Sequence, residues 1–99
     1  MVRKCKITES AKADVKEIIA HIARDNPQAA RRVRADIKEA FSKLAEHPFM
    51  GHVREDITHK SLRFWPVHSY QIIYNPETMP LVIVRVLSGY RDMADLLED

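Results

Sequence analysis

Residues 81–92 read Leu81-Val82-Ile83-Val84-Arg85-Val86-Leu87-Ser88-Gly89-Tyr90-Arg91-Asp92. The first seven of these residues are Leu, Ile or Val, with Arg85 as the exception. A continuous apolar run of this length, rich in β-branched side chains, is typical of a strand that is buried on both faces of a sheet. Gly89 supplies a turn at little steric cost, so we expect the strand to end near Ser88. The other elements should be arranged around this central strand.

Two arginines and a tyrosine lie within this strand or just beyond its end. Arg85 is inside the apolar run, and Tyr90 and Arg91 follow the turn. With Arg63 from a neighbouring predicted strand, they could converge on a phosphate or a carboxylate, because the guanidinium fork matches either anion. In the alternative interpretation, Arg85 pairs internally with Asp92 or with another carboxylate of the C-terminal tail. The sequence leaves both interpretations open.

The first half of the chain predicts a short strand followed by two helices. Residues 2–7 alternate roughly between basic and apolar side chains, which suits an edge strand whose Cys5 and Ile7 face the core. Whether this strand pairs at another sheet edge or beside the last strand is not decided by the sequence. Apolar residues then recur every three or four positions over residues 9–25 and 27–46, as in amphipathic helices. Because almost no loop separates the two helices, they must fold back on each other as an antiparallel hairpin.

Three polar or special residues mark the ends of these helices. Thr8 is expected to cap the first helix, since its side-chain oxygen can accept a hydrogen bond from a free backbone N–H of the first turn. Asn26 has the same expected role for the second helix. Pro27 follows at the first helical position, where its missing N–H costs nothing.

The second half of the chain predicts three strands joined by short turns. These strands cover residues 62–67, 70–74 and 81–87. The connections are His68-Ser69 and residues 75–80, which are short enough for an antiparallel meander. Residues 47–59 form the longest irregular segment, and a helix of one or two turns is expected near residues 93–97.

We therefore predict a single α+β domain over residues 1–99, with the element order β-α-α-β-β-β. An antiparallel helix hairpin packs on one face of a twisted antiparallel sheet, and a short C-terminal helix follows. No apolar run approaches the roughly 18 residues of a membrane span. No apolar segment follows the basic N-terminus, as it would in a signal peptide. Cys5 is the only cysteine, which fits the reducing cytoplasm.

Charge is unevenly distributed along the chain, although the net charge is only +2. Residues 1–63 carry 14 basic and 9 acidic residues, whereas residues 64–99 carry 2 and 5. Part of the basic excess lies on the polar side of the second predicted helix, at Arg31, Arg32, Arg34 and Lys38. This pattern indicates either an acidic macromolecular partner or an ordinary solvated surface balanced by an acidic tail.

The sequence contains no recognisable catalytic or metal-binding motif. The five histidines lie on different predicted elements, without the spacing of a metal site. Two glycines are too few for a Gly-rich phosphate loop. His68 and Ser69 are more plausible as polar turn residues than as a base and a nucleophile, because neighbours along a strand point to opposite faces. We expect no metal, no cofactor and no catalytic residue, and an arginine cluster that binds anions rather than transfers protons.

Several short segments form a familiar combination when taken in order. They are Arg63-Phe64-Trp65-Pro66-Val67, Tyr70-Gln71-Ile72-Ile73-Tyr74 and Arg85-Val86-Leu87-Ser88-Gly89-Tyr90-Arg91-Asp92, with Thr8, Ala11 and Asp14 early in the chain and Pro48 and Gly51 in the middle loop. In the order β-α-α-β-β-β, this combination resembles the ParE branch of the RelE/ParE toxin superfamily over essentially the whole chain. Ser88 stands where many ParE sequences have His, so the local match is inexact.

The resemblance implies the toxin of a type II toxin–antitoxin pair. Such a toxin would be neutralised by a ParD-like antitoxin whose C-terminal segment wraps around it. It would inhibit DNA gyrase without catalysing a reaction. RelE-like relatives are instead ribosome-dependent mRNA endonucleases, and this is the alternative function.

The resemblance and the arginine pattern together give a set of expected antitoxin- or target-binding residues. Buried aromatic and arginine anchors usually carry most of the affinity of such interfaces. The set is Arg31, Arg34, Arg63, Trp65, Arg85, Tyr90 and Arg91. Direct, sequence-specific binding to nucleic acid is not expected.

Overall fold

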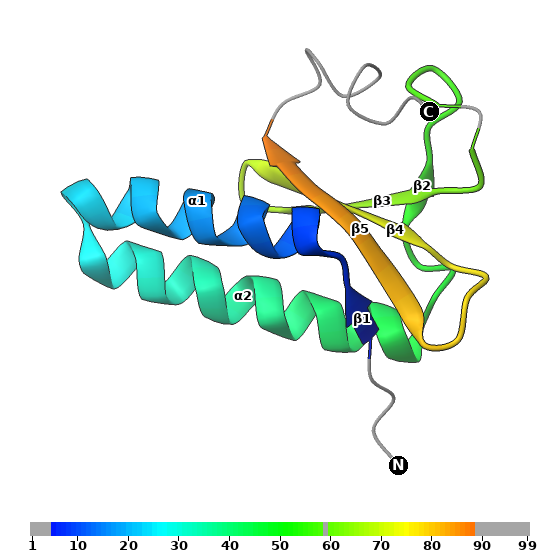
Figure 1. Cartoon of the computed structure of the whole chain (residues 1–99), viewed down its shortest axis with the longest axis horizontal. Helices are drawn as coiled ribbons and strands as arrows, with labels where there is room; N and C mark the ends of the chain where they lie inside the picture. The colour runs from blue at the N-terminus through cyan, green and yellow to red at the C-terminus, as the bar shows by residue number, and fades with distance from the viewer. Residues whose placement is uncertain (1–4, 59, 89–99) are drawn as a thin grey trace.

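A computed structural model describes residues 5–58 and 60–88 of the chain (Figure 1). These residues form two helices and a five-stranded sheet, an α+β architecture. The elements are β1 (Cys5–Ile7), α1 (Glu9–Asp25), α2 (Pro27–Glu46), β2 (His52–Val53), β3 (Arg63–Val67), β4 (Tyr70–Asn75) and β5 (Leu81–Ser88). Tyr90, Arg91 and the helix expected near residues 93–97 lie outside the described residues.

The helix hairpin has the boundaries that the capping residues predict. The Thr8 hydroxyl accepts a hydrogen bond from the Ala11 N–H at 3.0 Å, and α1 begins at the next residue. The Asn26 side chain accepts one from the Ala29 N–H at 3.1 Å at the start of α2. Each bond satisfies a backbone donor that the helix itself leaves free. The two helices therefore run side by side as an antiparallel pair (Figure 1).

The sheet is mixed rather than wholly antiparallel, which corrects the prediction. Its strand order is β1-β5-β4-β3-β2, and β1 runs parallel to β5 while the other neighbours are antiparallel. The first strand is thus both an edge strand and the neighbour of the last strand. The two-residue β2 falls within the segment expected to be irregular, because a strand of that length has no alternation to detect.

The predicted burial of the central strand is confirmed on the face toward the helices and is partial on the other face. Leu81, Ile83 and Val86 of β5 pack with the helices in the main core. Val84 and Leu87 contact a second, smaller cluster formed by Leu62, Phe64 and Ile73.

One β-bulge interrupts the pairing of β4 with β5. Ile73 lies opposite Arg85, whereas the next residue, Tyr74, lies opposite Ile83. Val84 is therefore the extra residue on β5. A bulge of this kind bends the strand and redirects the side chains that follow it.

A buried tyrosine fastens the loop after α2 to the sheet. The Tyr74 ring is fully buried, and its hydroxyl accepts a hydrogen bond from the Gly51 N–H at 2.8 Å. Arg63 donates to the Gly51 carbonyl at 2.8 Å and to the Phe49 carbonyl at 3.3 Å. Burial raises the pKa of the Tyr74 phenol, although the Gly51 and Arg63 contacts oppose that shift. Gly51 is required here because a Cβ atom would lie 2.5 Å from the Tyr74 hydroxyl oxygen.

We predict that Gly51→Ala lowers the free energy of unfolding by about 1–3 kcal/mol, the usual range for overpacking a well-filled site. Urea unfolding of the wild type, Gly51→Ala, Tyr74→Phe and the double variant measures this. Tyr74→Phe alone should cost about 1–2 kcal/mol, since the Gly51 N–H loses its acceptor. In the Tyr74→Phe background the alanine should cost less, because the closest clashing atom is gone. Strictly additive losses would contradict this account.

Candidate interaction site

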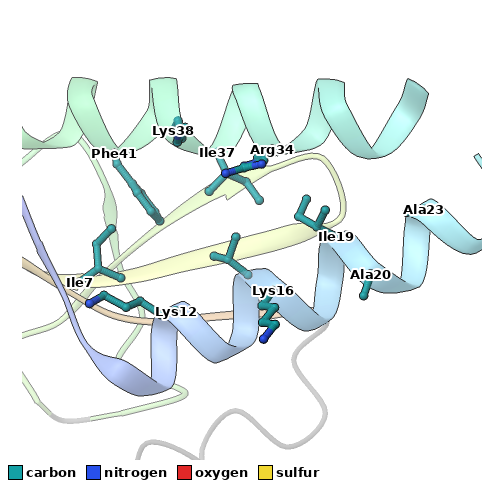
Figure 2. A pocket seen from close by; sticks show the side chains of 11 residues that line it. Ile7, Lys12, Lys16, Ile19, Ala20, Ala23, Arg34, Ile37, Lys38 and Phe41 are labelled. Carbon is teal, nitrogen blue, oxygen red and sulfur yellow. The ribbon is translucent and has the colours of Figure 1, made fainter. Parts of the chain in front are cut away.

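A groove with a largely apolar lining runs between the two helices. Its volume is about 540 Å³. Figure 2 shows α1 and α2 forming its two sides, with Ile7 of β1 at one end. It is lined by Ile7, Lys12, Val15, Lys16, Ile19, Ala20, Ala23, Arg34, Ile37, Lys38 and Phe41.

Basic side chains from both helices border this apolar floor. Lys12 and Lys16 come from α1, and Arg34 and Lys38 come from α2 (Figure 2). Lys12 also contacts Glu9 at 3.4 Å, but both side chains are exposed and such a pair is weak. No acidic residue is among those that line the groove. An amphipathic segment with acidic residues beside its apolar stripe would therefore match the groove in both polarity and charge.

The structure separates the two arginines of α2 that were predicted as binding residues. Arg34 lines the groove, whereas Arg31 is exposed on the same helix outside it. Sequence reasoning missed Lys12 and Lys16, because their spacing of four residues looks like the solvated side of any helix. The sequence does contain a signal for these two lysines, because apolar residues lie between and after them. This spacing puts both lysines beside an exposed apolar stripe of the helix.

Trp65, another predicted binding residue, lies away from the groove. It is partly buried against the main core, and its ring stacks on His52 with 6.3 Å between the ring centroids. Its role in binding stays a prediction.

Arg85 is held internally by a carboxylate of α1. Its Nε donates to Asp14 Oδ2 at 2.7 Å and its Nη2 donates to Asp14 Oδ1 at 2.8 Å. The side chains of Arg85 and Asp14 are 23% and 12% exposed, so this two-pronged pair is largely removed from water. The hydrogen bonds to Asp14 raise the pKa of Arg85 above its already high usual value. Asp14 is thus an internal partner of Arg85 within the described residues, whereas Asp92 and the tail carboxylates of the alternative interpretation lie outside them.

The expected convergence of Arg63 and Arg85 on one anion is wrong. Arg63 binds the carbonyls of the loop after α2, and its guanidinium lies 5.2 Å from the centroid of the Phe49 ring. Arg85 binds α1. Each guanidinium is committed to a different element, so the two do not form a shared anion site.

Asp14 and Thr8, the N-cap residue of α1, also form hydrogen bonds with backbone groups of β5. β1 ends at Ile7, opposite Ile83, and leaves the rest of that edge of β5 without a strand. There the Thr8 hydroxyl donates to the Val84 carbonyl at 2.7 Å, and the Val86 N–H donates to Asp14 Oδ2 at 3.0 Å. The start of α1 therefore supplies hydrogen bonds that a neighbouring strand would otherwise supply to this part of β5. The importance of Asp14 could not be read from the sequence, because its partners are about 70 positions away.

Histidine and carboxylate groups make structural contacts in the described part of the chain. His68, at φ 56° in the two-residue turn between β3 and β4, lies 2.7 Å from Asp36 Oδ2 and ties this hairpin to α2.

Among residues 5–58 and 60–88, no group of three or more His, Cys, Asp or Glu side chains could hold a metal ion. Of the helices described, neither α1 nor α2 combines the length and hydrophobicity needed to cross a membrane.

Comparison with known proteins gives consistent results. The family model described as ParE toxin of type II toxin-antitoxin system, parDE, matches residues 5–93. A solved structure described as the chromosomal ParDE TA system from P. aeruginosa has a similar fold, with a TM-score of 0.73 and 20% identity. The match covers 88% of this chain and 96% of that one. No curated protein sequence matched the chain.

We predict that Asp14→Ala lowers the free energy of unfolding by about 3 kcal/mol, because it leaves a largely buried guanidinium and the Val86 N–H without an acceptor. Asp14→Asn should be milder, since its amide oxygen can still accept from Val86. Chemical denaturation measures both effects. Glu17→Ala, an exposed carboxylate on the same helix, is the control and should stay within about 0.5 kcal/mol of the wild type. An Asp14→Ala variant as stable as this control would show that the pair is dispensable.

Proposed function

The chain belongs to the ParE toxin family of type II toxin–antitoxin systems, and from this premise we propose that it inhibits DNA gyrase and is neutralised by a ParD-like antitoxin. We further propose that it acts in the cytoplasm and breaks no covalent bond itself. The observation that carries the proposal is the groove between α1 and α2, with its apolar floor and basic borders.

The groove supports a protein partner whose segment is amphipathic and acidic. Its apolar lining includes Ile19 and Ala23 of α1, and Phe41 of α2 lies at the Ile7 end (Figure 2). Burying apolar side chains there would favour binding, because it removes apolar surface from water. Cations stand on both sides of the floor, so the partner needs carboxylates on both sides of its apolar stripe. A ParD-like antitoxin with an acidic amphipathic C-terminal segment has this chemistry.

The environment of Arg85 supports a binding function over RNA cleavage. A ribonuclease needs free cationic groups at the scissile phosphate together with a group that can transfer a proton. Arg85 has its donors directed at Asp14, and Arg63 has donors directed at backbone carbonyls. Releasing Arg85 would leave a carboxylate behind at the same place, which would repel phosphate.

We predict that the purified chain inhibits supercoiling by DNA gyrase and does not cleave mRNA on translating ribosomes. The two assays should be run with the same preparation, and the antitoxin should relieve the inhibition. Arg85→Lys keeps the charge but loses the two-pronged geometry. It should lower stability and leave ribosome-dependent cleavage absent. Cleavage of transcripts with gyrase unaffected would instead establish the RelE-type activity.

We predict that charge reversal on the groove weakens antitoxin binding. Lys16→Glu and Arg34→Glu lie on opposite sides of the groove, and each should raise the Kd about tenfold, mainly through slower association. Arg31→Glu is the matched control, because it makes the same change on α2 outside the groove. Association should also slow as salt rises, since exposed charges are screened beyond about 8–10 Å. Equal effects of Arg31→Glu and Arg34→Glu, or rates that do not depend on salt, would contradict the groove as the binding site.

A further inference from the structure

The loop after α2 presents an exposed aromatic side chain that the fold holds in place. Phe49 is 62% exposed, and the Arg63 guanidinium lies 5.2 Å from the centroid of its ring. The same guanidinium donates to the carbonyls of Phe49 and Gly51. The Gly51 N–H in turn donates to the buried Tyr74 hydroxyl. Both the Phe49 ring and the backbone that carries it are therefore fixed before a partner arrives.

A fixed aromatic side chain on the surface is well suited to binding a protein. Association usually requires mobile side chains to be ordered, and this loss of freedom weakens the affinity. Phe49 is already ordered by Arg63, so little freedom remains to be lost. Buried aromatic residues often dominate the energy of an interface. Single exposed apolar residues are nevertheless common on proteins, so the neighbourhood of Phe49 decides its role.

A hollow of about 250 Å³ lies beside Phe49. Its apolar lining includes Leu62, Pro76 and Val53, which is 54% exposed. Sites for cofactors and metabolites usually measure roughly 300–1,000 Å³, so this hollow suits a side chain of a protein better than a small molecule. It shares no lining residue with the helix groove. Val53 belongs to β2, the last strand of the sheet order and the edge opposite to β1 (Figure 1).

The rim of this hollow differs from that of the groove in charge. It carries the exposed carboxylates of Glu55 and Glu77, and neither forms an ion pair with a described residue. Of the two cations that line the hollow, Arg63 donates to backbone carbonyls and Lys60 is not free either. An acidic segment that matches the groove is therefore disfavoured here. A segment with Lys or Arg beside an apolar side chain matches instead.

We propose that Phe49 and the hollow beside it form the surface that contacts DNA gyrase. The gyrase segment bound there presents an apolar side chain to Val53 and Leu62, and a neighbouring Lys or Arg to the carboxylates of the rim. These carboxylates repel phosphate, so the contact is with the protein of gyrase and not with its DNA. The chain then uses different residues for its target and for its antitoxin. This inference rests on the proposed function, because it takes gyrase as the occupant.

The inference is tested by comparing the wild type with Phe49→Ala in two assays. One assay measures inhibition of supercoiling by purified gyrase holoenzyme, and the other measures direct binding to that holoenzyme without DNA. Phe49→Ala should raise the inhibitory concentration and the Kd about thirtyfold, the effect of losing an aromatic hot spot. The Kd for the ParD-like protein encoded by the adjoining gene should stay within about twofold, because Phe49 does not line the groove. Retained antitoxin binding also verifies that the variant is folded.

Met79→Ala is the matched control for Phe49→Ala. Met79 is also a large exposed apolar residue, 84% exposed, but it does not line the hollow. Its removal should leave both assays within about twofold of the wild type.

A second pair of variants tests the charge of the rim. Glu77→Lys should raise the Kd for gyrase about five- to tenfold, mainly through slower association, because it opposes the cation of the bound segment. Asp25→Lys makes the same change of charge at the end of α1. Asp25 is exposed and lines neither the groove nor the hollow, so this control should bind gyrase like the wild type.

The outcomes separate this inference from the proposed function. If the wild type inhibits gyrase and Phe49→Ala inhibits it equally well, the inference is wrong and the proposed function stands. Equal losses of gyrase and antitoxin binding in Phe49→Ala would also overturn the inference, because the two surfaces would not be separate. Binding of the wild type to DNA alone that Phe49→Ala abolishes would overturn the choice of a protein occupant. A wild type that leaves gyrase unaffected would overturn both proposals.

Discussion

The rest of the structure depends on the carboxylate of Asp14, which forms hydrogen bonds with both a charged side chain and a backbone N–H of β5. It neutralises the Arg85 guanidinium through two hydrogen bonds and accepts a third from the Val86 N–H. Without it, the central strand would carry an uncompensated charge and an open edge against the helices. Together with the hydrogen bond from the Thr8 hydroxyl to the Val84 carbonyl, it allows β1 to end at Ile7 and the chain to turn directly into α1. This contact therefore holds the start of α1 against β5.

This arrangement separates cations that maintain the fold from cations that are free to act on a partner. Arg63 and Arg85 have internal acceptors, and the energy of those contacts is used in holding loops and strands together. Lys16, Arg34 and Lys38 border an apolar groove instead, with no carboxylate among its lining residues. Of the basic residues in the first part of the chain, those on the helices border the groove, and they are the ones on which our proposal relies. The strand arginines Arg63 and Arg85 have hydrogen-bond acceptors within the fold.

Much of the fold could be predicted from local signals, and the rest depends on distant contacts. The helices begin where Thr8 and Asn26 place them, because capping is decided within a few residues. The meander strands were predicted to within a residue or two, since their apolar runs and turns are also local. The parallel pairing of β1, the bulge at Val84 and the Asp14–Arg85 pair were missed. Each depends on which segments meet across the fold, and no spacing in the sequence encodes that.

The stacked pair formed by Trp65 and His52 has a practical consequence for anyone following this molecule in solution. Trp65 is the only tryptophan of the chain, so it dominates the ultraviolet emission of the protein. It lies where β3 meets β2, and it is not among the residues that line the helix groove. Intrinsic fluorescence will therefore report mainly on the surroundings of β2 and β3, and only indirectly, through the shared core, on events between the helices. A dye or isotope label on α1 or α2 is the appropriate spectroscopic probe for that region.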